Sequence, residues 1–307
     1  MIENKISIID TPGKQLFIFV GIVLVSVLFV SLAGIVFAYP FFDGDVMSEL
    51  SKLASEDANM GLLKYFQIVN QLGLFIVPTL VFGHFVMKGN STFYKITYVP
   101  PAKYFLLAIA LLFAALPIVG ILTEWNEAIQ LPDYFNSINQ WMRDSEDSAR
   151  RITTALLEQS NIWDFFVNMI MIAIIPAIGE ELFFRGVIQQ LFQRWFNNSH
   201  SAIIVTAIIF SAFHMQFFGF FPRLLLGAIL GYLFYWTNSL WVPILTHFIN
   251  NGMAVVVGFL EARNGIPSYI DDMSNNEISI YTLIISLLFV SAIVFLFSKK
   301  KALNSNN

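Results

Sequence analysis

The stretch IIPAIGEELFFRG, which runs from Ile174 to Gly186, places two adjacent glutamates and an arginine directly after a long apolar run. On an α-helix, Glu181 and Arg185 are four residues apart on one face and can form an ion pair. Glu180 points about 100° away and is not offered the same partner. An ionised side chain in a bilayer core costs roughly 2.5–3.5 kcal/mol and marks a functional site by default. The stretch therefore predicts a membrane helix that carries a chemical site.

The composition supports a membrane location for the whole chain. Of the 307 residues, 57% are hydrophobic and only 12% are charged, whereas soluble domains carry about 25% charged residues. The absence of cysteine excludes disulfide frameworks, Cys-ligated metal sites and thiol nucleophiles. The net charge of −4 gives no footprint for nucleic acid, so no nucleic-acid partner is expected. We expect an all-α polytopic membrane protein whose outer surface contacts membrane lipid.

Eight segments are apolar enough to be membrane-spanning helices, which need about 20 residues each. The sixth is short, and we expect it to be tilted, incomplete or shielded by its neighbours. The fourth span is expected to continue through 186–196. This extension would bring Glu180 to the same depth in the membrane as His214 in the fifth span. The predicted spans are 16–38, 65–87, 104–123, 163–184, 202–221, 224–236, 240–259 and 278–298.

The segments between the predicted spans alternate in charge. Segment 88–103 has three Lys and no acid, segment 185–200 has two Arg and no acid, and segment 124–161 has seven acids against three Arg. Basic segments stay on the cytoplasmic side of a membrane, which places both termini in the cytoplasm. We expect a multi-pass protein of a bacterial plasma membrane. Its segment 124–161 is expected to form one or two external helices lying on the bundle, with a solvated loop as the alternative.

Polar side chains also interrupt two later spans. His214 lies in the otherwise apolar fifth span, and His247 and Asn251 lie four residues apart on one face of the seventh. Two hydrogen-bonding side chains on a buried stripe can stabilise a developing oxyanion, and a buried carboxylate without a cation, such as Glu180, can serve as a general base. The alternative interpretations are a solvated charge cluster at the inner membrane surface and ordinary interhelical hydrogen bonding.

The ordered set of motifs resembles the signature of the CPBP family, also called the CAAX-protease or Abi family, whose members are intramembrane glutamic endopeptidases. The resemblance covers about residues 160–260. It implies a catalytic core at 160–262, preceded by membrane helices and the external segment in 1–159, and followed by the last membrane helix and a basic cytoplasmic tail in 263–307. The pattern E-E-x-x-x-R, F-x-x-x-H and H-x-x-x-N is matched by Glu180, Glu181 and Arg185, by Phe210 and His214, and by His247 and Asn251.

The resemblance implies a mechanism like that of type II CAAX prenyl endopeptidases. Glu180 and His214 would activate water, and His247 and Asn251 would hold the oxyanion of the tetrahedral intermediate. The resemblance implies no cofactor and no metal. A zinc ion held by Glu180, His214 and His247 is the alternative. The expected substrate is a peptide or a membrane protein.

Glu181 and Arg185 would be a supporting pair that fixes the fourth helix. Two other function classes are weighed against the protease. A non-proteolytic membrane immunity or scaffold protein with the same fold would be expected to have lost at least one motif residue, and the set is intact here. A transporter that uses the glutamates as a proton relay would be expected to show repeated halves, which the sequence lacks.

Overall fold

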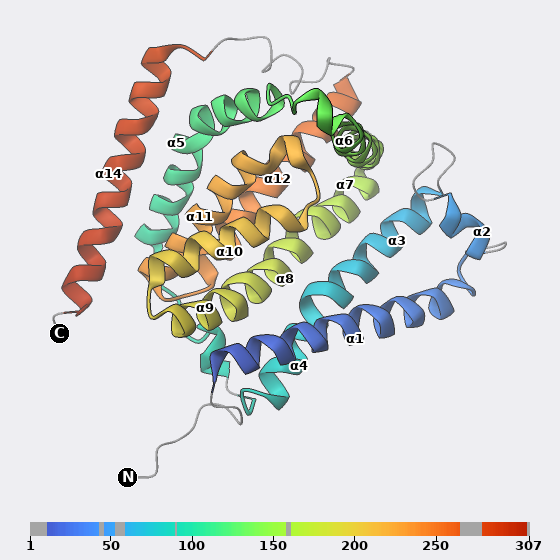
Figure 1. The fold of residues 1–307 in the computed structure, drawn as a ribbon, viewed down its shortest axis with the longest axis horizontal. Coiled ribbons are helices and arrows are strands. Elements are labelled where there is room, and N and C mark those ends of the chain that lie inside the picture. Colours follow the sequence, from blue (N-terminus) through green and yellow to red (C-terminus); the bar gives the residue numbers. More distant parts are fainter. Residues whose placement is uncertain are drawn as a thin grey trace.

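The computed structural model consists of helices joined by turns, with no strand, in the residues that it describes, which are 11–42, 46–52, 59–89, 91–157, 161–264 and 278–305. Seven helices in this part of the chain are long and apolar enough to cross a membrane, and a shorter apolar helix, Ser199–Phe213, follows the fourth of them. The predicted fold class, a polytopic bundle of about eight helices, is confirmed (Figure 1). Of the acids that the charge pattern counts in segment 124–161, Glu158 lies outside the described residues.

The N-terminal half supplies three spans and a polar helix. Its elements are α1 (Pro12–Ala38), α2 (Val46–Ser51), α3 (Met60–Gln71), η1 (Leu72–Ile76), α4 (Val77–Phe85), η2 (Ser91–Tyr94), α5 (Ala102–Glu127), η3 (Asp133–Phe135) and α6 (Asn136–Leu157). The π-helical turn η1 joins α3 to α4, so that the second span is continuous and packs against α1. Within segment 124–161, the polar helix α6 occupies residues 136–157.

The C-terminal half carries the motif residues. Its elements are α7 (Ile162–Asn168), η4 (Met169–Ile174), α8 (Ile175–Phe183), η5 (Phe184–Ile188), α9 (Gln189–Phe196), α10 (Ser199–Phe213), η6 (Phe217–Gly219), α11 (Phe220–Thr237), α12 (Trp241–Asn264) and α14 (Ile280–Ser305). From α7 to α9 the helix is continuous over 35 residues. The predicted extension of the fourth span beyond residue 186 is therefore confirmed. The turns η4 and η5 are π-helical and flank α8, which carries both glutamates.

The fifth and sixth spans differ from the prediction. The fifth, α10, has 15 residues and ends at Phe213 rather than at 221, whereas α11 has 18 residues, so the fifth and not the sixth is the short one. Hydropathy is continuous across the break and hides it. Two features produce the break: Met215 adopts a left-handed backbone with φ 51°, and Asn126 of α5 binds the main chain on both sides of η6. Its Nδ2 donates to the Phe217 carbonyl, and its Oδ1 accepts from the Phe221 N–H, both at 2.9 Å.

A tight turn between α9 and α10 sets the depth of the site. Asn197 ends α9 in a left-handed conformation, and the side chain of Asn198 caps α10 by accepting two backbone N–H groups. Glu180 lies 17 residues before Asn197, and His214 lies 17 residues after it. With a rise of 1.5 Å per residue, both lie about 25 Å from the turn. The first and second motifs therefore reach the same level in the bundle.

Aromatic packing fixes the helix that carries the glutamates. The ring of Phe183 lies 5.0 Å from that of Phe19 on α1 and 5.2 Å from that of Phe75 on η1. Phe184 contacts Phe210 of α10 at 5.2 Å between ring centroids. These residues belong to the largest group of packed buried side chains in the described part of the chain. Helix α8 is thus held by apolar contacts on the faces that its charged residues leave free.

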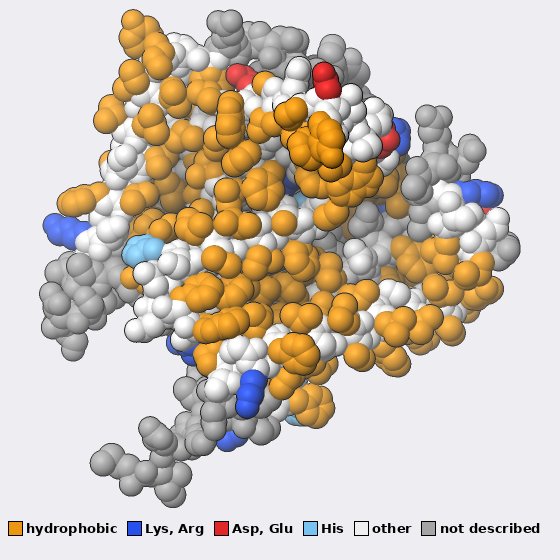
Figure 2. Space-filling view, viewed as in Figure 1, with side chains coloured by type: hydrophobic (Ala, Val, Ile, Leu, Met, Phe, Trp, Pro, Cys, Tyr) orange, Lys and Arg blue, Asp and Glu red, His pale blue; other side chains and the backbone are white. Residues whose placement is uncertain are grey.

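The outside of the bundle is apolar. Large hydrophobic side chains on α1 and α14 are more than half exposed, among them Leu28 and Phe289. Figure 2 shows hydrophobic side chains over most of one face, with charged side chains at its margins. A continuous apolar surface of this kind is the one that lipid requires and that a soluble protein avoids. The protein is a multi-pass integral membrane protein.

Candidate active site

Three polar residues at four-residue spacing on one face fasten the fourth span to α11. They are Glu181, Arg185 and Gln189. Arg185 Nη1 donates to Glu181 Oε1 at 2.7 Å, and both side chains are fully buried. Arg185 Nη2 donates to the Gly227 carbonyl at 2.7 Å, and Gln189, one turn further on, donates to the Gly231 carbonyl at 3.1 Å. The ion pair predicted from the i, i+4 spacing is present. It is buried among the helices and is not a solvated surface cluster.

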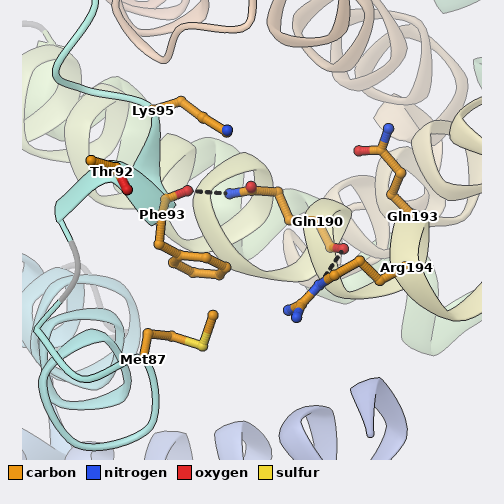
Figure 3. A pocket seen from close by; sticks show the side chains of 7 residues that line it. All are labelled: Met87, Thr92, Phe93, Lys95, Gln190, Gln193 and Arg194. Carbon is orange, nitrogen blue, oxygen red and sulfur yellow. Dashed lines mark hydrogen bonds between the residues drawn. The ribbon is translucent and has the colours of Figure 1, made fainter. Parts of the chain in front are cut away.

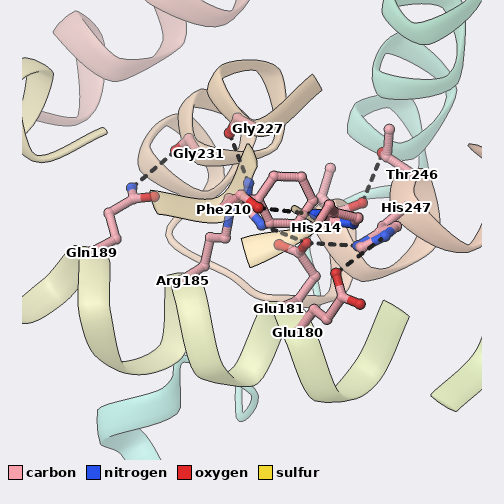
Figure 4. A network of polar contacts seen from close by, with 11 residues as sticks. Glu180, Glu181, Arg185, Gln189, Phe210, His214, Gly227, Gly231, Thr246 and His247 are labelled. Carbon is pink, nitrogen blue, oxygen red and sulfur yellow. Dashed lines mark hydrogen bonds and ion pairs between the residues drawn. The ribbon is translucent and has the colours of Figure 1, made fainter. Parts of the chain in front are cut away.

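The imidazole of His247 lies between the two glutamates (Figure 4). Its Nδ1 is 2.9 Å from Glu181 Oε1, and its Nε2 is 3.9 Å from Glu180 Oε2. A carboxylate only accepts hydrogen bonds, so the first contact assigns a proton to Nδ1. The ring is only 2% exposed. Glu181 therefore orients the ring so that its second nitrogen faces Glu180.

Glu180 is the carboxylate that remains available for reaction. It is buried, and its Oε2 has no hydrogen-bond partner among the residues that the structure describes. Oε2 of the neighbouring Glu181 is likewise without a partner there, but its Oε1 accepts from Arg185 and from His247. Two adjacent carboxylates thus have different surroundings, which is the arrangement that separates a reacting group from a supporting one.

His214 reaches the site from the end of α10. Its Nδ1 is 3.0 Å from the Phe210 carbonyl, and the side chain is exposed beside the break that precedes α11. The ring of Phe210 lies 5.1 Å from His214 and 5.9 Å from His247. The Arg185 guanidinium stands 4.8 Å from the centre of the same ring. Phe210, the aromatic residue of the second motif, thus packs against one residue from each motif. These residues are Arg185, His214 and His247.

Asn251 lies on α12, one turn beyond His247. Its Nδ2 donates to the Ile172 carbonyl in η4 at 3.2 Å, and its Oδ1 accepts from Asn250 at 3.1 Å. The amide nitrogen carries two hydrogens, and the contact with Ile172 uses one of them. Asn251 therefore connects α12 to the π-helical turn and keeps a donor for another group.

The predicted residues come together to different degrees. His247 hydrogen-bonds Glu181 and lies 3.9 Å from Glu180, and Arg185 joins this group through Glu181. His214 is linked to them through Phe210. In the part of the chain that the structure describes, no group of three His, Cys, Asp or Glu side chains is arranged to hold a metal ion. The zinc set allowed by the sequence is not assembled there.

Sequence reasoning missed two polar residues near the site. Gln189 follows Glu181 and Arg185 at the same four-residue spacing, and this spacing could have identified it as part of the same helix face. Arg223, at the start of α11, donates from Nη1 to the Gln216 carbonyl at 2.9 Å and from Nη2 to the Gln216 side chain at 2.5 Å. It fixes the loop that follows His214. Arg223 lies between the predicted fifth and sixth spans, so the cost of a charge inside a span did not identify it.

Comparison with known proteins gives two matches. Residues 162–253 match the family model described as type II CAAX prenyl endopeptidase Rce1-like. A curated relative, the uncharacterized protein YpbD of Bacillus subtilis (strain 168), is 29% identical over 86 residues, which make up 27% of this chain and 41% of YpbD. The chain therefore matches less than half of that relative's length. No solved structure matches the chain. The matched region extends from α7 into α12 and contains all three motifs.

Proposed function

We propose that this chain, whose residues 162–253 form an Rce1-like domain, is an intramembrane endopeptidase in which Glu180 activates the attacking water. The observation that carries the proposal is the difference between the two glutamates. Oε2 is buried without a partner in both glutamates, but Oε1 of Glu181 accepts from Arg185 and His247, whereas no described residue donates a hydrogen bond to the Glu180 carboxylate. A carboxylate placed in this way can take a proton from water.

The proposed reaction is the hydrolysis of one peptide bond. Glu180 takes a proton from a water molecule that His214 orients, and the resulting hydroxide attacks the scissile carbonyl carbon. With both ring nitrogens protonated, His247 donates from Nε2, and together with the second amide hydrogen of Asn251 it stabilises the oxyanion. Glu180 then gives its proton to the leaving nitrogen as the carbon–nitrogen bond breaks. Glu181 and Arg185 contact no reacting atom and keep His247 and the fourth span in position.

The depth of the site limits the substrate. Glu180 lies about 25 Å along the helix from the α9–α10 turn, in the interior of a 35-residue helix. A peptide bond must enter the helical bundle to reach it. We propose that the substrate is a membrane-associated peptide or a membrane protein, with prenylated CAAX peptides as one class to test. No cofactor is included in the proposal.

The test compares Glu180→Gln with Glu181→Gln in the purified full chain reconstituted into liposomes. The probes are a farnesylated CAAX peptide, its unprenylated counterpart and extracted host membrane proteins, with new N-termini counted by mass spectrometry. General acid–base catalysis contributes about 10²–10⁴-fold, so Glu180→Gln should lower cleavage at least about 100-fold. Its unfolding temperature should change little, whereas that of Glu181→Gln should fall because Arg185 loses its partner.

Glu127→Gln is the matched control, because Glu127 is exposed and its nearest basic atom, on Arg150, is 3.9 Å away. This variant should cleave like the original protein. If Glu180→Gln releases the same new N-termini at the same rate, the protease proposal fails. A biological activity that persists in Glu180→Gln would then point to the non-proteolytic immunity or scaffold protein.

A further inference from the structure

A second site lies near α9, at the end of the fourth span that is far from α7. A cavity of about 200 Å³ opens between α9 and the segment that joins α4 to α5 (Figure 3). It is lined by Met87, Thr92, Phe93, Lys95, Gln190, Gln193 and Arg194. Arg194 lies 14 residues beyond Glu180 on the same continuous helix, which is about 21 Å along its axis. The cavity is therefore separate from the candidate active site.

The lining of this cavity is basic. It contains one arginine and one lysine and no acidic residue. Within the described residues, Arg194 contacts neutral groups: its Nη2 donates to Gln15 Oε1 at 2.8 Å, its Nε lies 3.4 Å from the Gln190 carbonyl, and its guanidinium stands 5.9 Å from the Phe93 ring centre. These contacts leave several of its N–H donors for a ligand. The cavity offers positive charge that no described carboxylate neutralises.

The walls of the cavity are held in place without a ligand. Lys95 has a left-handed backbone with φ 57°, and its carbonyl accepts the Leu240 N–H at 3.1 Å. Gln190 Nε2 donates to the Phe93 carbonyl at 2.9 Å, which connects α9 to η2. In Figure 3 the ammonium of Lys95 points into the space in front of Gln190. The two cations are thus presented from opposite walls that the main chain fixes.

Exposed aromatic side chains indicate the depth of the cavity in the membrane. Trp195, next to Arg194, is 53% exposed, and Trp241 and Tyr98 are 41% and 48% exposed at the same end of the bundle. The indole N–H of Trp241 donates to the Ile96 carbonyl, one residue from Lys95. Trp and Tyr gather at the level of the lipid headgroups. The cavity therefore lies at the membrane–water interface.

The size of the cavity suits a small anion. Its volume of about 200 Å³ is below the roughly 300 Å³ at which pockets for drug-sized molecules start. A guanidinium binds two phosphate oxygens at once, and a lysine adds a compact charge. A phosphate group fits this combination of volume, charge and donors.

We propose that this cavity binds the phosphate of an anionic phospholipid headgroup, with Arg194 and Lys95 as its ligands. The acyl chains of that lipid lie along the apolar outer surface of the bundle. The proposal is independent of proteolysis, because none of the cavity residues belongs to the candidate active site.

The experiment uses the purified full chain in a mild detergent and native mass spectrometry. Phosphatidylglycerol and phosphatidylcholine are added in equal amounts, and the retained lipid is counted for the original protein and for Arg194→Gln and Lys95→Gln. We expect the original protein to retain phosphatidylglycerol in several-fold excess. Each substitution should lower that retention about 5-fold, as expected for one basic residue at an anionic surface.

Lys103→Gln is the matched control, because Lys103 is exposed at the same end of the bundle but does not line the cavity. It should retain phosphatidylglycerol like the original protein. Inorganic phosphate tests the source of the anion. The site binds free phosphate if two results are found together. Neither lipid is preferred, and phosphate raises the unfolding temperature of the original protein but not that of Arg194→Gln. The proposal is overturned if both lipids are retained equally and phosphate has no effect, or if Lys103→Gln loses as much lipid as Arg194→Gln.

Discussion

His247 contacts Glu180 and Glu181 through opposite nitrogens of one ring, so a single side chain connects the two carboxylates. Arg185 binds the second of these carboxylates and also the main chain of α11. Adjacent glutamates on a helix point in different directions, so Glu181 is held by Arg185 and His247 while Glu180 faces the other nitrogen of the His247 ring. This arrangement supports the proposed roles of the two carboxylates.

Loss of Arg185 should destabilise the protein strongly. Arg185→Met leaves Glu181 as a buried charge without its cation, and removal of one partner of a buried pair costs about 3–5 kcal/mol. Unfolding in detergent, followed by circular dichroism, should show a clearly lower unfolding temperature. Arg150→Met is the control: Arg150 is exposed on α6 and lies 3.9 Å from Glu127, so its loss should change stability by less than about 1 kcal/mol. Equal shifts in the two variants would contradict the role assigned to the buried pair.

At the level of elements, the hairpin of α10 and α11 brings the second motif to the site. Gly227 and Gly231 allow α11 to approach its neighbours closely. A Cβ atom at Gly231 would lie 2.9 Å from Gln189 Oε1 and 2.9 Å from Ile203 Cγ2, and one at Gly227 would lie 3.1 Å from a ring carbon of Phe210. The small-residue spacing in α11 is thus used for packing against α9 and α10.

Gly231→Ala should therefore weaken the bundle. The added methyl group must push apart α11 and α10 or displace the Gln189 side chain, and overpacking of this kind costs about 1–3 kcal/mol. Gly21→Ala in α1 is the matched control, because a Cβ there meets no atom within 4 Å, and Ala in a helix is favoured over Gly by about 0.5–1 kcal/mol. Unfolding temperatures in the same detergent should fall for the first variant and stay equal or rise for the second. The reverse order would show that α11 is not closely packed at this point.

For the whole molecule, α6 covers the turn that follows His214. The ring of Trp141 lies 5.1 Å from that of Phe217, and the guanidinium of Arg143 stands 5.0 Å from the ring centre of Phe218. Asn126 binds the same turn from the end of α5. Helix α6 thus packs against the turn that follows His214, whereas the external position of segment 124–161 stays a prediction.

The charge pattern predicts which ends of the bundle face the cytoplasm. Because the chain has no cysteine, single-cysteine variants report on one position each. We expect Asp147→Cys on α6 to react with a membrane-impermeant maleimide added to intact cells. Lys103→Cys and Lys299→Cys should react only after the membrane is permeabilised. The opposite labelling pattern would invert the predicted orientation, and labelling of all three in intact cells would reject the topology.

Local properties of the sequence were enough to predict most of the architecture. Long apolar runs identify spanning helices because a bilayer must be crossed by residues without free backbone polar groups. Spacing along one helix identifies the pair Glu181 and Arg185, because helical geometry alone brings residues four apart together. The three motifs indicated a resemblance to a protease family, and residues 162–253, which contain them, match the type II CAAX prenyl endopeptidase Rce1-like model.

Contacts between helices were decided only by the tertiary structure. Hydropathy cannot show that α10 ends at Phe213, because the break depends on Asn126, which lies far away in the sequence. Periodicity along α12 cannot show that the ring of His247 lies between two carboxylates of α8. The basic cavity likewise joins residues about 100 positions apart. A sequence specifies the faces of its helices locally, whereas the pairing of those faces depends on the packing of the whole bundle.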